Sequence, residues 1–300
     1  MIEAKNLSKS FGKTEVLKDM NCIIKDGSIY GLIGANGAGK STFLRLISGV
    51  YYPQSGYLTV DGKDVYENNE IKRRIIFVAD EFYIPQGITV RKQAAMYEAL
   101  YGNFDHEYFE KNLEKLSLKL DDKLANYSKG MKRQAIMLCA LACKGDYYLF
   151  DETFDGLDPV VRNHMKKLLY AEIAERGATI VLTSHNLREL EDICDHLGVL
   201  YKGGIMFEGD INDIKSNVFK VQLGFKEDFD ERKFKDFEIM SFRKAGSVAT
   251  LIVKGDADST TEKLKELKPL FLDVLQLTLE EVFIYEMEVL GYAFGEISDK

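Results

Sequence analysis

The chain has 300 residues, of which 46% are hydrophobic, so it is long enough to form one large domain or two. Acidic residues outnumber basic ones by 48 to 40, and the net charge of −8 argues against nucleic acid as the main partner. No run of about 18 apolar residues occurs, and residues 1–6 lack the apolar stretch of a signal peptide. With four cysteines and no C-x-x-C pair, the sequence predicts a cytoplasmic protein with reduced thiols and no membrane span.

Short apolar runs alternate with helical periodicity over the first two thirds of the chain, which predicts an α/β core with parallel strands. In chain order, the predicted elements are strands at 2–8, 14–24 and 28–33, a helix at 43–47, strands at 57–60 and 74–79, a helical block at 89–120, a helix at 128–143, a strand at 147–150, a helix at 160–175 and a strand at 179–183. Cys139 and Cys143 share one face of a predicted helix, where apolar packing explains them better than a metal site does.

The composition shifts near Val218. Residues 218–300 carry 12 basic and 17 acidic groups, net −5, against 28 and 31, net −3, in residues 1–217. The predicted elements of this tail are strands at 219–223, 238–242, 248–253 and 270–277, a short helix at 232–237 and two helices that begin at the capping boxes Ser259-x-x-Glu262 and Thr278-x-x-Glu281. We therefore expect a second domain at 218–300, with the βαββαβα order of a small ferredoxin-like α+β fold.

The segment after the strand at 28–33 fits the phosphate-binding pattern G-x-x-x-x-G-K-[ST]. It reads Gly34-Ala35-Asn36-Gly37-Ala38-Gly39-Lys40-Ser41-Thr42. The three glycines let backbone N–H groups turn toward an anion, and the following helix adds its dipole. Lys40 is expected to reach the β- and γ-phosphates of a nucleotide, and the Ser41 hydroxyl to bind Mg²⁺. A chance glycine-rich turn is the alternative, and the strand–loop–helix context argues against it.

Two carboxylates follow the buried strand at 147–150. Asp151 is expected to hold Mg²⁺ at the carboxyl end of the strand, and Glu152 to polarise a water that attacks the γ-phosphate. Ordinary solvated acids are the alternative. His185 follows the strand at 179–183, at the edge where parallel strands place ligands, and is expected to orient this water and the γ-phosphate. The alternative for His185 is a structural role in capping the segment 187–190.

A second anion-binding helix start is predicted at Tyr127-Ser128-Lys129-Gly130-Met131, where Ser128 is a natural N-cap and Gly130 leaves the backbone open. One subunit does not obviously need two phosphate sites. Two subunits packed head-to-tail would use both, if each helix start closed the nucleotide site of the other. A plain serine N-cap is the alternative.

Together these motifs resemble those of an ABC-family ATP-binding subunit, over about residues 1–217. The resemblance implies a RecA-like α/β core, an N-terminal antiparallel β part and a helical insert at about 89–144. It also implies the following matches: Gly34 to Thr42 with the Walker A loop, Asp151 and Glu152 with the Walker B aspartate and the catalytic glutamate, Ser128 and Gly130 with the signature motif, Asp158 in Gly156-Leu157-Asp158-Pro159 with the D-loop, His185 with the switch histidine, and Phe11 with the aromatic residue that stacks on adenine.

The sequence departs from the family pattern at two places. Asp80 stands where the family usually has a glutamine, and because aspartate offers only anionic oxygens, we expect it as an extra Mg²⁺ ligand beside Ser41 and Asp151. Lys129 replaces a glycine of the signature, and its ammonium faces either solvent or the nucleotide. This signature, and the segment Leu279-Glu280-Glu281-Val282-Phe283, resemble those of ATPase subunits of bacterial exporters related to antibiotic and peptide resistance.

The resemblance implies an ATPase that dimerises around two ATP molecules and Mg²⁺, either as a homodimer or with a related subunit. It also implies a separate integral membrane permease, docked near Phe82, Tyr83 and the helical insert, at the cytoplasmic face of a bacterial-type membrane. No nucleic acid partner is expected. The alternative is a soluble ABC ATPase with a role in translation or on DNA, although this chain has one cassette and no long heptad coiled coil. For residues 218–300, regulation, dimerisation and simple stabilisation remain open.

Overall fold

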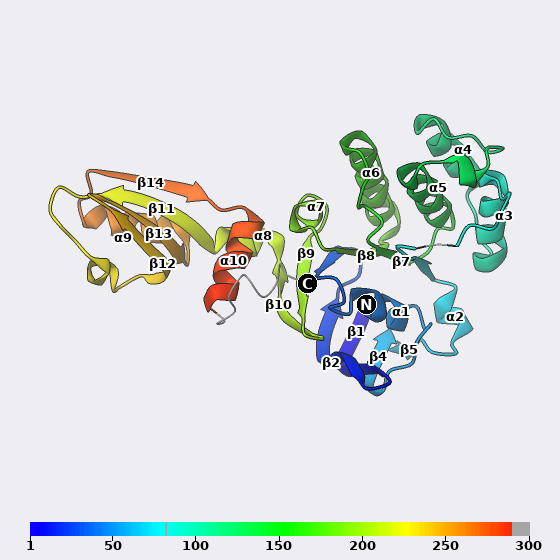
Figure 1. Ribbon diagram of the computed structural model, residues 1–300, viewed down its shortest axis with the longest axis horizontal. Coiled ribbons are helices and arrows are strands. Elements are labelled where there is room, and N and C mark those ends of the chain that lie inside the picture. The colour runs from blue at the N-terminus through cyan, green and yellow to red at the C-terminus, as the bar shows by residue number, and fades with distance from the viewer. Residues whose placement is uncertain (82, 290–300) are drawn as a thin grey trace. The chain divides into compact units, whose positions relative to one another are not determined.

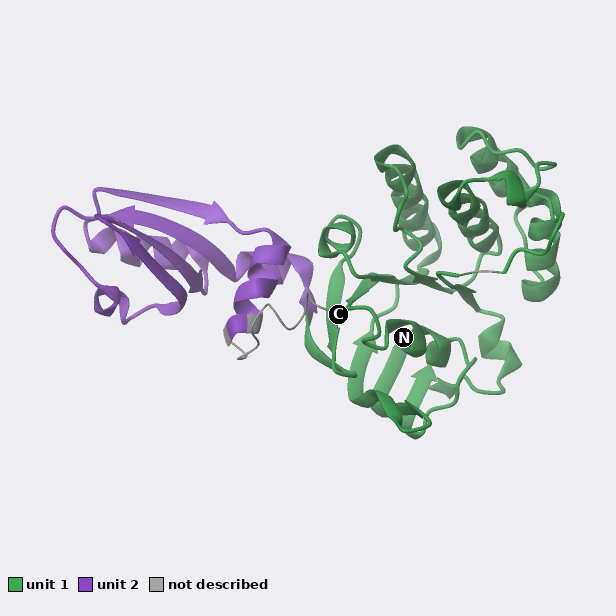
Figure 2. Cartoon of the chain, in the orientation of Figure 1, with its two compact units in different colours: residues 1–208 green, residues 209–300 purple. Residues whose placement is uncertain are grey.

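The computed structural model describes residues 1–81 and 83–289, and the chain divides into two compact units (Figure 2). The first unit spans residues 1–208 and the second residues 209–300. This division lies before α8 (Ile211–Ser216), whereas the change in composition pointed to 217/218. Helix α8 contacts α10 (Leu279–Val289), and its Ile211 and Ile214 are buried, so apolar packing rather than charge sets the boundary.

The first unit contains two sheets. The larger one has the strand order β10-β9-β3-β8-β7-β6. Its strands are β3 (Ile29–Ile33), β6 (Ile75–Val78), β7 (Tyr147–Asp151), β8 (Thr179–Ser184), β9 (His196–Tyr201) and β10 (Gly204–Asp210). Pairing is parallel between β3 and both β8 and β9, and between β7 and both β6 and β8. The smaller sheet is antiparallel, with the order β2-β1-β4-β5, and consists of β1 (Ile2–Phe11), β2 (Thr14–Ile24), β4 (Ser55–Val60) and β5 (Lys63–Asp64).

Helix α1 (Lys40–Ile47) packs between the two sheets of the first unit (Figure 1). Its Phe43 and Leu44 are buried in one core with Leu7 of β1 and Leu149 of β7. The opposite face of the larger sheet is covered by helices that include α6 (Pro159–Arg176) and α7 (Leu187–Glu191). Because β7 and β8 are buried on both faces, they read as continuous apolar runs in the sequence. The predicted α/β core with an N-terminal antiparallel part is therefore confirmed.

The helical insert consists of α3 (Val90–Tyr101), α4 (His106–Lys115), a 3₁₀ turn (Leu124–Asn126) and α5 (Lys129–Ala142), and follows the short helix α2 (Asn69–Lys72) and β6. The sequence predicted one helical block at 89–120, but Gly102 ends α3 in a left-handed conformation and Asp105 caps α4. Ser117, with a φ of 55°, lies beyond the end of α4. Both α3 and α4 pack against α5, whose last ten residues, 133–142, are all buried.

The second unit has an antiparallel sheet with the order β12-β13-β11-β14. Its elements are β11 (Val218–Gly224), a 3₁₀ turn (Glu231–Phe234), β12 (Glu238–Ala245), β13 (Val248–Lys254), α9 (Ala257–Glu266), β14 (Phe271–Gln276) and α10. The predicted α+β fold is present, with the first helix reduced to a 3₁₀ turn.

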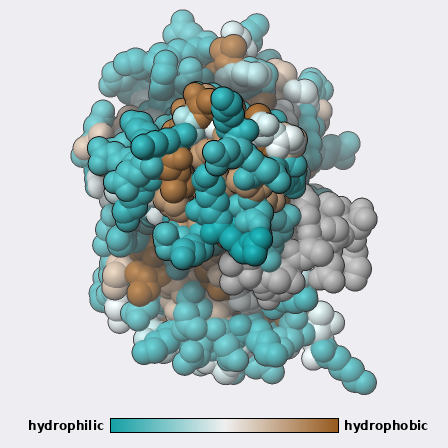
Figure 3. All heavy atoms as spheres, turned by 90° about the vertical axis from the view of Figure 1, so that its left-hand side faces the viewer, coloured by the Kyte–Doolittle hydropathy of each residue, from teal (hydrophilic) through white to brown (hydrophobic). Residues whose placement is uncertain are grey.

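The face of the molecule in Figure 3 is mostly hydrophilic, with apolar patches between the polar side chains.

The two capping boxes of the second unit have different outcomes. The helix start predicted at Ser259 is wrong, because Asp256 caps α9 and its Oδ2 accepts a hydrogen bond from the Ser259 amide at 2.8 Å. The box at Thr278 is present: the Glu281 amide donates to Thr278 Oγ1 at 3.2 Å, and the Thr278 amide to Glu281 Oε2 at 2.9 Å.

All four cysteines are buried free thiols. Burial raises the pKa of the Cys143 thiol to about 12, and that of Cys139 is raised as well, in keeping with apolar packing of both side chains. Within residues 1–81 and 83–289, no helix has the length and apolar character needed to cross a membrane.

Candidate functional site

The predicted phosphate-binding loop connects β3 to α1, and its glycines are required by the backbone. Gly37 and Gly39 have φ values of +80° and +113°, which L side chains rarely adopt. A Cβ atom on Gly34 would lie 2.7 Å from the Leu200 carbonyl oxygen, and one on Gly39 2.7 Å from Leu17 Cδ2. The glycine spacing found in the sequence is therefore the spacing that this turn needs.

Lys40 is the first residue of α1 and its side chain is only 4% exposed. Its Nζ donates to the carbonyl oxygens of Gly34 at 2.6 Å and Ala35 at 3.3 Å. It also lies 3.1 Å from Glu152 Oε1. The loop thus holds the buried Lys40 ammonium group next to the carboxylate of Glu152, which directly follows β7. Ser41 and Thr42 occupy the first turn of the same helix.

Asp151 and Glu152 are both positioned by Thr183 of the neighbouring strand β8. Thr183 Oγ1 donates to Asp151 Oδ1 at 2.7 Å and accepts a hydrogen bond from the Glu152 amide at 3.0 Å. Asp151 is 1% exposed, which does not fit an ordinary solvated acid. Glu152 has a φ of 47°, a left-handed conformation that is unusual for a residue with a side chain and recurs at functional sites.

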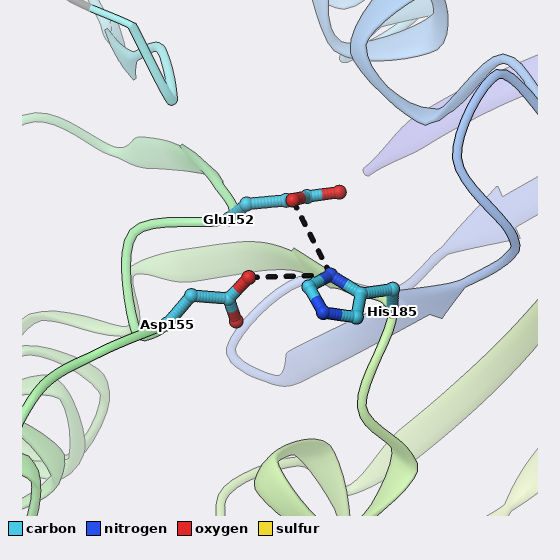
Figure 4. Close-up of side chains that lie close together, drawn as sticks. All are labelled: Glu152, Asp155 and His185. Carbon is cyan, nitrogen blue, oxygen red and sulfur yellow. Dashed lines mark ion pairs between the residues drawn. The ribbon is translucent and has the colours of Figure 1, made fainter.

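His185 lies between two carboxylates (Figure 4). Its Nδ1 is 3.4 Å from Glu152 Oε2 and 3.3 Å from Asp155 Oδ2. One ligand atom from each of these three side chains lies within 4.8 Å of the others, a spacing that a divalent cation can bridge. The alternative role as a helix cap is wrong for His185, because Asn186 caps α7. The imidazole instead faces the carboxylate proposed to act on water.

Asp155 is a site residue that the sequence analysis did not identify. Ser184 Oγ lies 3.3 Å from Asp155 Oδ1 and 3.1 Å from Glu189 Oε2, so its one O–H can donate to either carboxylate. Burial and the neighbouring Glu189 raise the pKa of Asp155 to about 6, while His185 and Arg133 act in the opposite direction. Its place in the short loop that follows Glu152 was the one sequence feature that could have indicated a role. Its partners Ser184 and His185 are distant in the chain, so the sequence did not reveal the contacts.

Ser128 and Asp158 are both helix caps. Ser128 Oγ accepts a hydrogen bond from the Met131 amide at 3.2 Å, and Asp158 Oδ1 accepts one from the Val160 amide at 3.0 Å. A Cβ atom on Gly130 would lie 3.5 Å from the Gly156 carbonyl oxygen, so the start of α5 lies beside the loop that contains Asp158. The predicted N-cap of α5 is therefore present, together with a surface shared by the two predicted motifs. The side chain of Lys129 is exposed, as both the solvent-facing and the nucleotide-facing alternatives require.

Phe11 ends β1 and is 43% exposed. Its ring meets Tyr51 edge-on, with centroids 5.2 Å apart, and Lys9 Nζ lies 5.5 Å from the Phe11 ring centroid. One face of an aromatic ring near a cation is therefore available on the N-terminal sheet. This arrangement fits the stacking role predicted for Phe11 and does not test it.

Asp80 follows β6 and forms an ion pair with Arg133 of α5. The Arg133 side chain is 3% exposed, and it also donates to the Asp155 carbonyl oxygen. The role predicted for Asp80, as a Mg²⁺ ligand, stays a prediction, but its carboxylate has a cationic partner that the sequence analysis did not identify. Phe82, named above as part of a docking surface, lies outside the described residues, and Tyr83 is 88% exposed.

The sequence of this chain is similar to those of known proteins. The family model described as ABC transporter matches residues 17–155. The ABC transporter ATP-binding protein YtrB of Bacillus subtilis (strain 168) is 32% identical, over 95% of this chain and 97% of YtrB. The linearmycin resistance ATP-binding protein LnrL of the same organism is 32% identical over 73% of this chain and 72% of LnrL. The methionine import ATP-binding protein MetN of Clostridioides difficile (strain 630) is 32% identical over 71% of this chain and 70% of MetN.

Solved structures share the fold. An ATP-binding subunit of an ABC transporter matches with a TM-score of 0.65 and 28% identity, over 72% of this chain and 92% of that chain. The bacterial ABC transporter cassette MJ0796, solved as a dimer, matches with a TM-score of 0.63 and 24% identity, over 70% of this chain and 99% of that chain.

Proposed function

Because the chain belongs to the ABC transporter family, as an ATP-binding subunit with ATPase activity, we propose that it powers an exporter through ATP-driven head-to-tail dimerisation. The observation that carries its hydrolytic part is the distance of 3.1 Å between Lys40 Nζ and Glu152 Oε1. It brings the cation of the phosphate-binding loop and a candidate base to one place. Phosphoryl transfer depends chiefly on such positioning and on charge stabilisation.

ATP is proposed to bind along the loop from Gly34 to Thr42. The backbone amides of the glycine-rich turn and the Lys40 ammonium hold the phosphates, because they supply positive charge and donors at the start of α1. Phe11 supplies an exposed aromatic face for the adenine ring. The exposed fraction of Phe11, 43%, suits an adenine ring that lies against the N-terminal sheet.

Mg²⁺ is proposed to bind at Ser41 and Asp151. A hydroxyl and a buried carboxylate are hard oxygen donors, which suit this ion when phosphate oxygens and water complete its coordination. When bound, the ion neutralises charge on the β- and γ-phosphates. Thr183 Oγ1 holds the Asp151 carboxylate at 2.7 Å, so the donor is oriented before any ion arrives.

Glu152 is proposed to act as the general base for the attacking water, and His185 to orient that water and the γ-phosphate. The two side chains are 3.4 Å apart at Nδ1 and Oε2, within reach of a shared hydrogen-bond network. The left-handed backbone of Glu152 directs this carboxylate away from the line of β7 and toward the Lys40 ammonium.

The second half of each site is proposed to come from a partner subunit, which is either a second copy or a related chain. Ser128, Gly130 and Asp158 would supply it, because the start of α5 and the loop before α6 lie side by side on one surface. A helix start with open backbone amides favours an anion. MJ0796, a cassette that shares this fold, was solved as a dimer.

A separate integral membrane permease is proposed as the other partner, which would place the chain at the cytoplasmic face of a membrane. Exposed apolar side chains on and before the insert favour this surface: Tyr83 is 88% exposed, Leu100 68% and Met96 43%. We propose export rather than import on the variant signature motif and on the similarity to the resistance protein LnrL; MetN, an import protein by name, is similar to the same degree. No nucleic acid partner is proposed.

Co-purification from bacterial membranes tests the transport role. The tagged chain is expected to bring down an integral membrane protein, and Tyr83→Ser with Leu100→Ser is expected to weaken this association without lowering the basal ATPase rate. Tyr52→Ser is the matched control, because Tyr52 is 62% exposed on the N-terminal part. Recovery of the chain with ribosomes or DNA, and without a membrane protein, would contradict transport and favour the soluble ABC ATPase.

A further inference from the structure

Arg133 is a buried cation at which three segments of the first unit meet. It lies in the second turn of α5, and its side chain is 3% exposed. Its Nη2 donates to Asp80 Oδ1 in the loop after β6, and its Nη1 donates to the Asp155 carbonyl oxygen in the loop after β7. One guanidinium group therefore connects the helical insert to two loops at the carboxyl edge of the larger sheet.

Asp80 supplies the charge that this buried cation requires. Removing a guanidinium from water costs several kcal/mol unless a well-placed anion and hydrogen bonds compensate. Within residues 1–81 and 83–289, Asp80 is the carboxylate that pairs with Arg133, whereas Arg133 Nε is buried without a hydrogen-bond partner. A neutral amide at position 80 would leave the cation without its ion-pair partner, with the Asp155 carboxylate acting on it only electrostatically, so this pair explains why an acid is found there.

Asp155 connects the pair to the hydrolytic groups. Its backbone carbonyl accepts from Arg133, while its carboxylate lies 3.3 Å from His185 Nδ1. Any displacement of Arg133 therefore moves the same residue that contacts the imidazole. Because α5 begins directly after Ser128, a partner subunit that engages Ser128 acts on the helix that carries Arg133.

We propose that Arg133, balanced by Asp80, is a positioning residue that holds the Asp155 loop against α5 for hydrolysis, and that Asp80 serves Arg133 rather than Mg²⁺. This inference rests on the roles proposed for Glu152 and His185. This arrangement links the start of α5 to His185 of the same subunit through the side chains of Arg133 and Asp155 and the Asp155 carbonyl group.

A mutant cycle tests the pair, with Asp80→Asn, Arg133→Met and the double variant. Each single substitution is expected to lower kcat by about tenfold, equivalent to about 1.4 kcal/mol of transition-state stabilisation, with the KM for ATP unchanged. In the Arg133→Met background, Asp80→Asn is expected to have no further effect on kcat. The Mg²⁺ concentration for half-maximal activity is expected to stay at the wild-type value in all three variants.

Arg133→Lys separates positioning from simple charge balance. Lysine keeps the charge that faces Asp80 but cannot span two acceptors with a planar fork. We expect the melting temperature without nucleotide to stay near the wild-type value while kcat remains low. Full recovery of kcat in Arg133→Lys would overturn the positioning role.

Two further results would overturn the inference. One is an equal rise in the Mg²⁺ requirement on Asp80→Asn with and without Arg133, which would make Asp80 a metal ligand. The other is independent, multiplying effects of the two single substitutions on kcat. Glu81→Gln is the control, because Glu81 is an exposed acid next to Asp80 and is expected to change neither kcat nor melting temperature. Glu152→Gln, measured alongside, distinguishes the two failures: if it retains turnover, the proposed site is wrong, and if it is inactive, only the inference fails.

Discussion

Lys40 Nζ and Glu152 Oε1 lie 3.1 Å apart, although Lys40 begins α1 and Glu152 follows β7. Both side chains are largely buried, with 4% and 18% of their surfaces exposed. Phosphate oxygens that bind Lys40 compete with Glu152 for the same ammonium group. Binding of ATP is therefore expected to free the Glu152 carboxylate for the attacking water.

The first prediction concerns Glu152→Gln. Removing the carboxylate is expected to lower the ATPase rate by at least about a hundredfold, because the proposed base is lost. ATP binding is expected to persist, and the ATP-bound dimer to become more stable, since hydrolysis no longer opens it. Turnover assays and size-exclusion chromatography with light scattering measure the two effects. Glu175→Gln, at an exposed position of α6, is the control; turnover in Glu152→Gln at the wild-type rate would remove Glu152 from the mechanism.

The second prediction concerns His185→Ala. Loss of the imidazole that faces Glu152 is expected to lower kcat by about a hundredfold while the KM for ATP changes little, because the contact matters mainly in the transition state. Steady-state kinetics at saturating Mg²⁺ measure this split. His185→Gln, which keeps a hydrogen-bonding group, is expected to recover part of the rate. A parallel rise in KM would instead assign His185 to ground-state nucleotide binding.

The third prediction concerns the dependence of stability on pH. Burial and Glu189 raise the pKa of Asp155 to about 6, from an ordinary value of 3.8, against the opposing effects of His185 and Arg133. A carboxyl group whose pKa is raised by folding binds its proton more tightly in the folded state, so its contribution to stability is present at low pH and is lost as pH rises toward 6. Melting curves of the wild type and Asp155→Asn are expected to diverge in favour of the variant between pH values of about 4 and 6. Parallel curves would contradict the raised pKa.

The fourth prediction concerns the boundary between the two units. Residues 1–217 retain α8 without α10, whereas residues 1–208 end where the first unit ends. The longer fragment lacks α10 and β11, which α8 contacts, so Ile211 and Ile214, which are 4% and 8% exposed in the whole chain, are expected to become more exposed there. We expect fragment 1–208 to be monodisperse and fragment 1–217 to bind more of a dye that detects exposed apolar surface. Equal dye binding by the two fragments would place α8 with the first unit.

The same fragments address the role of the second unit. If it regulates the ATPase or supports dimerisation, its removal is expected to change the turnover rate or the stability of the dimer with ATP. Unchanged turnover, dimerisation and transport in fragment 1–208 would leave stabilisation as its role. Light scattering and ATPase assays on the whole chain and the fragment decide between these outcomes.

Local patterns allowed the phosphate-binding loop to be predicted from the sequence. The turn between β3 and α1 needs glycine at Gly34, Gly37 and Gly39 for steric and conformational reasons that are local to the segment. The strand before Asp151 is likewise recognisable, because burial on both faces makes it uniformly apolar. Such features depend on neighbours within a few residues in the chain.

Contacts between distant residues were not predictable from one sequence. Asp80 and Arg133 are 53 positions apart, and nothing in either local segment indicates that they pair. The start of α9 was misplaced for a different reason: Asp256 and Ser259 both favour a helix start, and the structure uses the aspartate. The left-handed backbone of Glu152 was also missed, since only the three-dimensional path of the loop after β7 requires it.

Thr183 has a consequence for how this site can change. Its hydroxyl group bonds the Asp151 carboxylate and the Glu152 amide at once, and its carbonyl oxygen accepts from the same amide at 3.2 Å. The candidate metal ligand, Asp151, and the candidate base, Glu152, are therefore both hydrogen-bonded to one residue of β8. A shift of β8 along β7 would displace them together. The relative positions of the two acids are protected against small distortions of the sheet, while substitution of Thr183 by valine would release the Asp151 carboxylate and leave the Glu152 amide bonded to the carbonyl oxygen of position 183 alone.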